Sequence, residues 1–278
     1  MKPRLSIALL VLTWPLFCAS PGDVVLPAES TLLDTGFRQM YDLQFDSAHL
    51  TFQEWMREHP EDPMGPASDA AGYLFAELDR LKILQSEFFL HDDLFANRKK
   101  PVADPALKQK FDSALGQSEQ LAARALQQDP QNQNALFASL MRVGLHSDYL
   151  ALIEKRYLAS LSEVKTSRTL AEKLIATNPN YCDAYLAIGV ENYLLSLKPA
   201  PLRWLLRAGG AETDKDRGIQ NLALTAERGH FLRPYARVLL AVAALRDKNV
   251  ARAKELLEGL SKAFPHNRLY SQELARLR

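Results

Sequence analysis

The sequence predicts an all-α protein, built as an array of antiparallel helix pairs. Apolar residues recur at helical spacing through most of the chain, and stops that contain proline interrupt them. Because proline lacks an amide hydrogen and disfavours helix in the residue before it, each stop ends one helix before the next begins. The proline stops are His59-Pro60, Asp129-Pro130, Asn178-Pro179 and Phe264-Pro265, and the basic turn and glycine of Arg228-Gly229 make a fifth.

These stops divide the chain into five helix pairs and a terminal helix. Asp104-Pro105 supplies a cap and a first-turn proline for one helix, and the short apolar run at residues 24–26 ends in Pro27 and predicts no strand. The predicted pairs are 29–41 with 45–58, 66–91 with 104–128, 133–146 with 148–177, 182–197 with 215–228, and 232–246 with 249–263, followed by a capping helix at 267–277.

Composition is consistent with one helical-repeat domain over residues 23–278. The chain has 278 residues, of which 47% are hydrophobic and 24% charged, so it can bury a substantial core. Its formal net charge of +1 predicts neither a nucleic-acid-binding protein nor a polybasic membrane-binding protein.

The first 22 residues are typical of a secretory signal peptide. Lys2 and Arg4 precede an apolar run at residues 5–17, which is too short to span a bilayer. We therefore expect export, most simply to a bacterial periplasm, with secretion or an outer-membrane lipoprotein as alternatives. Cys18 could carry a lipid, although the bulky Phe17 before it departs from the lipoprotein pattern.

One apolar spacing occurs twice, near the two ends of the chain. Ala48, Phe52, Trp55 and Pro60 are separated by 4, 3 and 5 residues, and so are Ala253, Leu257, Leu260 and Pro265. A small residue, Gly36 or Ala241, lies 24 residues before each of these prolines. Small residues at such positions let two helices approach closely, and large apolar residues fill the space beside them.

This pattern resembles the tetratricopeptide repeat, a helix–turn–helix unit of about 34 residues. The resemblance covers most of residues 29–277, but only the first and last units keep the regular length. It implies a right-handed superhelical array, a TPR-like α-solenoid, whose first helices line a concave groove. By register with the family, the residues expected to line it are Phe137, Met141, Leu186, Val190, Tyr193, Val238 and Val242.

The groove has two possible roles at this stage. It could bind a protein or peptide partner, or it could be filled by long helices or by the insertion at residues 198–214. The family's known grip on a peptide carboxylate uses Lys, Arg and Asn side chains, whereas this groove offers only Asn134 and Asn192 beside apolar residues. We therefore do not expect that grip here.

The insertion carries Trp204 between Arg203 and Arg207. A tryptophan can bury about 150–250 Å², so the ring is expected to dock on something. Docking on the chain's own helices is the first expectation, and docking on a partner or a membrane surface is the alternative. The two arginines lie four residues apart, on one helical face, and could contact anionic groups or pair with Glu212, Asp214 or Asp216.

Catalytic and metal-binding patterns are missing from the sequence. The six histidines show no metal-ligand spacing, Cys-x-x-Cys is absent, and Gly209-Gly210 lacks the ending of a phosphate loop. Glu191, within an apolar helix, is expected to form a structural salt bridge, perhaps with Arg217 or Arg237. We expect no enzyme activity and no cofactor or metal.

These observations favour an exported, non-catalytic scaffold of the cell envelope that binds a protein or peptide partner. The candidate binding residues are Phe137, Met141, Leu186, Val190, Tyr193, Arg203, Trp204 and Arg207. The alternative is a membrane-associated envelope assembly component, anchored through Cys18 or docked through residues 199–208. The partner's identity and the oligomeric state are not encoded in any motif.

Overall fold

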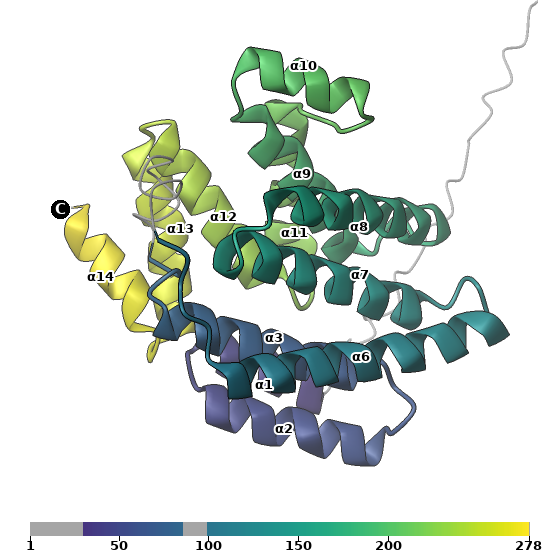
Figure 1. Cartoon of the computed structure of the whole chain (residues 1–278). Helices are drawn as coiled ribbons and strands as arrows, with labels where there is room; N and C mark the ends of the chain where they lie inside the picture. Colours follow the sequence, from purple (N-terminus) through teal and green to yellow (C-terminus); the bar gives the residue numbers. More distant parts are fainter. Residues whose placement is uncertain (1–29, 86–98, 278) are drawn as a thin grey trace, which may run out of the picture.

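The computed structural model describes residues 30–85 and 99–277, and every regular element in these residues is helical (Figure 1). The predicted signal peptide, Cys18, residues 24–26 and the predicted helical residues 86–91 lie outside the described residues. The helices are α1 (Leu32–Tyr41), α2 (Phe45–Glu58), α3 (Met64–Arg80), α6 (Pro105–Gln128), α7 (Gln133–Asp148), α8 (Tyr157–Thr177), α9 (Tyr185–Ser196), α10 (Ala200–Ala208), α11 (Lys215–Arg228), α12 (Arg233–Arg246), α13 (Val250–Ala263) and α14 (Arg268–Arg276).

The predicted pairs are confirmed as packed neighbours: α1 with α2, α3 with α6, α7 with α8, α9 with α11, and α12 with α13. Side-chain caps mark half of these helix starts. Thr31 and Asp34 form a capping box for α1, and Asp104 accepts the backbone N–H groups of Ala106 and Leu107 in front of α6. Asn132, Asp214, Asn249 and Asn267 cap later helices in the same way.

Two predicted helix boundaries are wrong, and the backbone shows why. Helix α3 ends at Arg80, because Lys82 takes a left-handed conformation (φ 57°) and the Ile83 amide closes back onto the carbonyl of Leu78. Helix α7 runs to Asp148 and continues as a π-helical turn, Tyr149–Ile153, before Lys155 (φ 60°) breaks the chain. Helix α8 therefore starts at Tyr157 and not at residue 148.

The small residues have the predicted role in helix packing. A Cβ added at Gly36 would lie 2.3 Å from the Phe52 ring, and one at Gly189 would lie 3.0 Å from Leu222. Ala48 and Ala253 are fully buried. These contacts bring α1 close to α2 and α9 close to α11. The small and large apolar residues at the repeated spacing are therefore the ones that pack the paired helices together.

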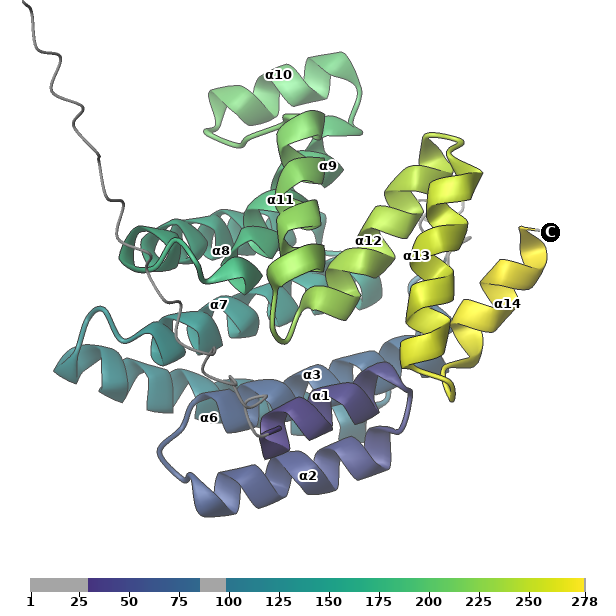
Figure 2. The ribbon, with the colours of Figure 1, turned by 180° about the vertical axis from the view of Figure 1, so that it is seen from behind.

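The last helices lie beside the first ones (Figure 2). The ring of Phe231, just before α12, lies 4.8 Å from that of Phe37 in α1. Ahead of α14, the Asn267 amide donates to the carbonyl of Tyr41 at 2.8 Å, and Arg268 pairs with Asp79 of α3 at 2.8 Å. The array therefore curves far enough for its two ends to touch. Among the described residues, no helix is both long and apolar enough to cross a membrane.

Candidate functional site: an apolar groove with a buried carboxyl

The inner helices enclose two adjoining cavities, each of about 110 Å³, which we call the groove. The cavities share five lining residues and therefore lie side by side; these are Met40, Tyr41, Phe75, Asp148 and Tyr235. One cavity extends between α12, α13 and α14, and the other extends between α7, α8 and α9. The groove is thus elongated and is walled by the first helices of the pairs.

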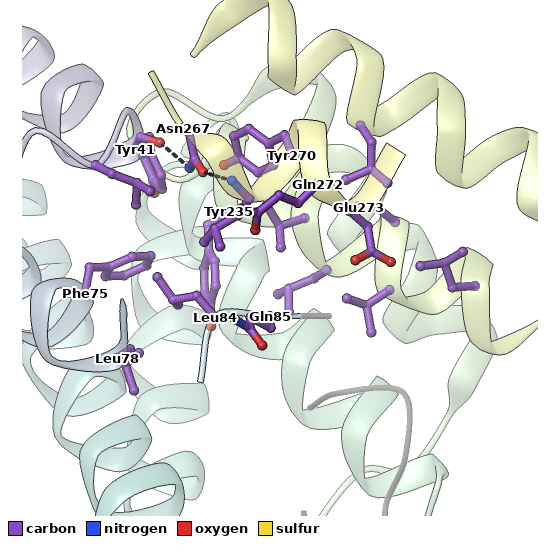
Figure 3. Close-up of a pocket in the computed structure, with 18 of the residues that line it drawn as sticks. Tyr41, Phe75, Leu78, Leu84, Gln85, Tyr235, Asn267, Tyr270, Gln272 and Glu273 are labelled. Atoms are coloured by element: carbon purple, nitrogen blue, oxygen red, sulfur yellow. Dashed lines mark hydrogen bonds between the residues drawn. The ribbon is translucent and has the colours of Figure 1, made fainter. Parts of the chain in front are cut away.

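The cavity beside α14 has an aromatic and aliphatic wall with a polar rim (Figure 3). Tyr41, Phe75 and Tyr235 form the aromatic side, and the ring centroids of Phe75 and Tyr235 lie 5.8 Å apart, edge to face. The polar side chains of Gln85, Gln272 and Glu273 lie around it, from the end of α3 and from α14. Such a surface suits an apolar guest with a few polar groups.

Asp148 supplies a carboxyl that borders both cavities. It is the last residue of α7 and is followed at once by the π-helical turn. The Tyr235 hydroxyl donates to it and favours its charged form, but burial outweighs this hydrogen bond and raises the pKa of Asp148 to about 7. The side chain retains a little solvent access, which it gains through the groove.

The phenols around this carboxyl stay protonated. Burial and the nearby Asp148 raise the pKa of Tyr235 well above its ordinary value, and burial does the same for Tyr41. Burial likewise raises the pKa of Tyr270. The groove therefore presents hydroxyl donors and one carboxyl whose charge can change near neutral pH.

Asp183 fixes the position of α12 against the groove. Its buried carboxylate accepts the backbone N–H groups of His230, Phe231 and Leu232 at 2.9, 3.4 and 2.9 Å. Burial raises the pKa of Asp183, and these three hydrogen bonds oppose that shift. Since its lone pairs are occupied by the chain itself, Asp183 is a positioning residue for the loop that leads into α12.

The residues predicted to line the groove divide into two groups. Met141, Leu186 and Val190 border the cavity beside α9, and Val238 and Val242 border the cavity beside α14. Phe137 is fully buried behind the groove, against Tyr181 and Phe231, and Tyr193 lies in a separate cluster between α9, α11 and α12.

The alternative that the insertion fills the groove is wrong, because no residue of 198–214 lines either cavity. Asp148 and Tyr235 were missed as groove residues. One signal was available for Asp148, since an acidic residue in the last turn of a helix opposes the helix dipole.

The predicted docking of Trp204 on the chain's own helices is also wrong. Trp204 is 73% exposed and Leu205 60% exposed, and α10 has no buried residue. Arg203 donates to the carbonyl of Lys198 at 2.9 Å, and Arg207 to that of Thr213 at 3.1 Å, so neither pairs with the acidic residues expected. Two of these acidic residues interact elsewhere: Glu212 pairs with Arg217, and Asp214 caps α11.

Glu191 is buried and forms a structural salt bridge, as predicted, but with a different arginine from the two suggested. Arg168 of α8 reaches it at 3.5 Å, whereas Arg217 pairs with Glu212, and Arg237 donates to the carbonyl of Ala226. Burial raises the pKa of Glu191, and the Arg168 charge opposes that shift. This pair joins α8 to α9 and lies outside the groove.

Four histidines contact carboxyl groups within the fold. His49 contacts Asp69, His146 contacts Glu163, His230 contacts Asp34 and His266 contacts Asp42. In residues 30–85 and 99–277, no three His, Cys, Asp or Glu side chains are grouped so that they could hold a metal ion.

Comparison of the whole chain with protein-family models, with curated proteins and with solved structures finds no match.

Proposed function

We propose that this protein is an exported, non-catalytic binding scaffold, a right-handed array of the tetratricopeptide type whose groove holds an apolar segment of a partner protein. The observation that supports it best is the groove itself: two adjoining cavities between packed helices, with aromatic walls and a carboxyl that borders both. An elongated groove of this kind suits a chain with successive apolar side chains.

The polar groups of the groove are better suited to binding a ligand than to catalysing a reaction. Its titratable side chains are four acids and bases and three phenols: Asp148, Asp183, Glu273, Arg276, Tyr41, Tyr235 and Tyr270. Asp183 is occupied by backbone amides, and the phenols are held protonated by burial. Asp148 and Tyr235 are left as hydrogen-bonding groups that could fix the register of a bound segment.

The test uses three matched valine-to-phenylalanine substitutions. Val190→Phe would narrow the cavity beside α9 and Val238→Phe the cavity beside α14, whereas Val250, on α13, is 41% exposed and belongs to neither. Peptides selected from a random display library against the full chain would be measured by fluorescence anisotropy. We expect apolar peptides whose Kd rises at least about tenfold in either groove variant and is unchanged in Val250→Phe.

Two outcomes would overturn this proposal. One is that selection on the immobilised protein enriches no peptide relative to a control selection on the support without protein. The other is that Val190→Phe and Val238→Phe bind the selected peptides as well as the parent, with unchanged thermal unfolding, which would show that the cavities are packing defects. Export has its own test: the N-terminal mass of the protein from its native host is expected to correspond to a start near residues 20–23.

A further inference from the structure

Helix α10 leaves most of its apolar side chains in solvent, while its two arginines hydrogen-bond back to the chain. On a helix of 3.6 residues per turn, Arg203 and Arg207 share one face, and Leu202 and Leu205 share the opposite one. The guanidinium groups donate to backbone carbonyls at either end of the helix. Leu202 and Leu205 are 42% and 60% exposed. An ordinary surface helix buries its apolar stripe, whereas α10 buries no residue.

Trp204 lies at the border between these two faces and is 73% exposed. An indole with an apolar body and one polar N–H is favoured at the boundary between lipid headgroups and acyl chains. In both ribbon views α10 lies at one end of the molecule, beyond the ends of α9 and α11 (Figures 1 and 2). Its outer face could therefore meet a flat surface before the rest of the protein does.

Charge around α10 has one sign. Residues 198–211 contain Lys198, Arg203 and Arg207 and no acidic residue, although the chain as a whole has a formal net charge of only +1. Within the described part of the chain, the two arginines contact neutral carbonyl and hydroxyl oxygens, so their charge is not neutralised. A local cationic cluster of this kind attracts anionic lipid headgroups.

The small exposed apolar area of α10 favours a lipid surface over a protein partner. Three exposed side chains on a nine-residue helix offer an apolar area on the order of a few hundred Å², whereas a stable protein interface buries about 800 Å² per partner. An interfacial helix needs no complementary shape, and its affinity adds apolar burial to attraction by anionic lipid. We infer that α10 is a membrane-docking helix that inserts Leu202, Trp204 and Leu205 into the headgroup region of an anionic bilayer.

The decisive experiment compares two double variants on lipid vesicles. The first is Trp204→Ala with Leu205→Ala; its matched control is Leu50→Ala with Leu158→Ala, which removes two leucines that are 68% and 85% exposed elsewhere. Co-sedimentation would use vesicles of phosphatidylcholine with or without phosphatidylglycerol, at low and high salt. We expect binding to the anionic vesicles that weakens with salt, falls at least about tenfold in the α10 variant and persists in the control.

The intrinsic fluorescence of Trp204 gives a second readout. On adding anionic vesicles, the parent should show a blue shift that Trp204→Phe lacks, since the ring leaves water. Equal binding by both double variants, equal binding to neutral vesicles, or no binding would overturn the inference. So would a dimer in sedimentation velocity that only the α10 variant abolishes, because a second copy would then cover this face. Val190→Phe and Val238→Phe should leave vesicle binding unchanged, which separates this inference from the groove.

Discussion

Helices α10 and α12 have similar sequences and opposite positions. Each begins with a proline in its first turn and has two arginines one turn apart, Arg203 and Arg207 in α10 and Arg233 and Arg237 in α12, which donate to backbone carbonyls. Helix α12 buries Ala236, Leu240, Ala241, Val242 and Ala243, whereas α10 buries no residue. The shared pattern therefore predicts that a helix forms, and does not predict what its apolar side chains will contact.

The difference arises from the segments that precede the two helices. The loop before α12 is fixed by three hydrogen bonds to the buried Asp183, and Phe231 within it packs on α1 and α7 residues. The segment before α10 is short and ends at Pro199, and the arginines of α10 bond to residues close in sequence, Lys198 and Thr213. We conclude that α12 belongs to the fold and that α10 is an appended element.

The largest expected effect lies at the base of α12. Asp183→Ala would leave three partly buried N–H groups without their acceptor, so we expect the free energy of unfolding to fall by about 3 kcal/mol or more in urea titration. Asp183→Asn keeps one acceptor oxygen, so its free energy of unfolding should fall by less. A loss below about 1 kcal/mol in the alanine variant would show that water replaces the carboxylate, and that α12 does not depend on this anchor.

A smaller effect is expected where α11 meets α9, the two helices that α10 connects. A Cβ added at Gly218 would lie 2.6 Å from the backbone nitrogen of Tyr193, so the two helices would have to separate. Gly218→Ala should therefore cost about 3 kcal/mol in urea unfolding. Gly116→Ala is the control: its Cβ would have no neighbour within 4 Å, and replacing a helical glycine should stabilise by about 0.5–1 kcal/mol. Equal effects would contradict the close α9–α11 contact.

The contact between α12 and α7 should make stability depend on pH. The pKa of Asp148 is raised from 3.8 to about 7, so between these values the folded state binds more protons than the unfolded state, and stability falls as pH rises. The full shift corresponds to about 4 kcal/mol, and the partial solvent access of the carboxyl reduces our expectation to about 2 kcal/mol.

Asp148→Asn should remove this loss, so the variant gains stability over the parent at pH 8 and not at pH 4. Melting temperatures across this pH range provide the measurement. Tyr235→Phe should move the transition to higher pH, because the tyrosine hydrogen bond favours the charged carboxyl. Parallel curves for the parent and Asp148→Asn would mean that the carboxyl is solvated in the folded protein.

Most of the helices and their pairing could be predicted, because the prolines, caps and small residues that determine them act within one or two helical turns of the sequence. Gly36, Ala48 and Phe52 were identified as packing residues from spacing alone, and the structure confirms them. The ends of α3 and α7 were missed because lysines, Lys82 and Lys155, take left-handed conformations that usually signal glycine.

The site was less predictable because it depends on contacts that are distant in sequence. Asp148 and Tyr235 are far apart along the chain, and they meet because α12 packs beside the end of α7. This contact depends on how all the helices between them pack. No motif in the sequence encodes that packing, so neither Asp148 nor Tyr235 could be selected from spacing.

The smallest expected effect is at Trp204, and it is the sharpest test of the comparison between α10 and α12. Because the ring is 73% exposed, Trp204→Ala should change the free energy of unfolding by less than about 0.5 kcal/mol. Trp55→Ala is the matched control, since the half-buried Trp55 donates to Asp62 at 2.8 Å, and its loss should cost clearly more. If both variants lose the same stability, α10 packs on the body in solution and is part of the fold, as α12 is.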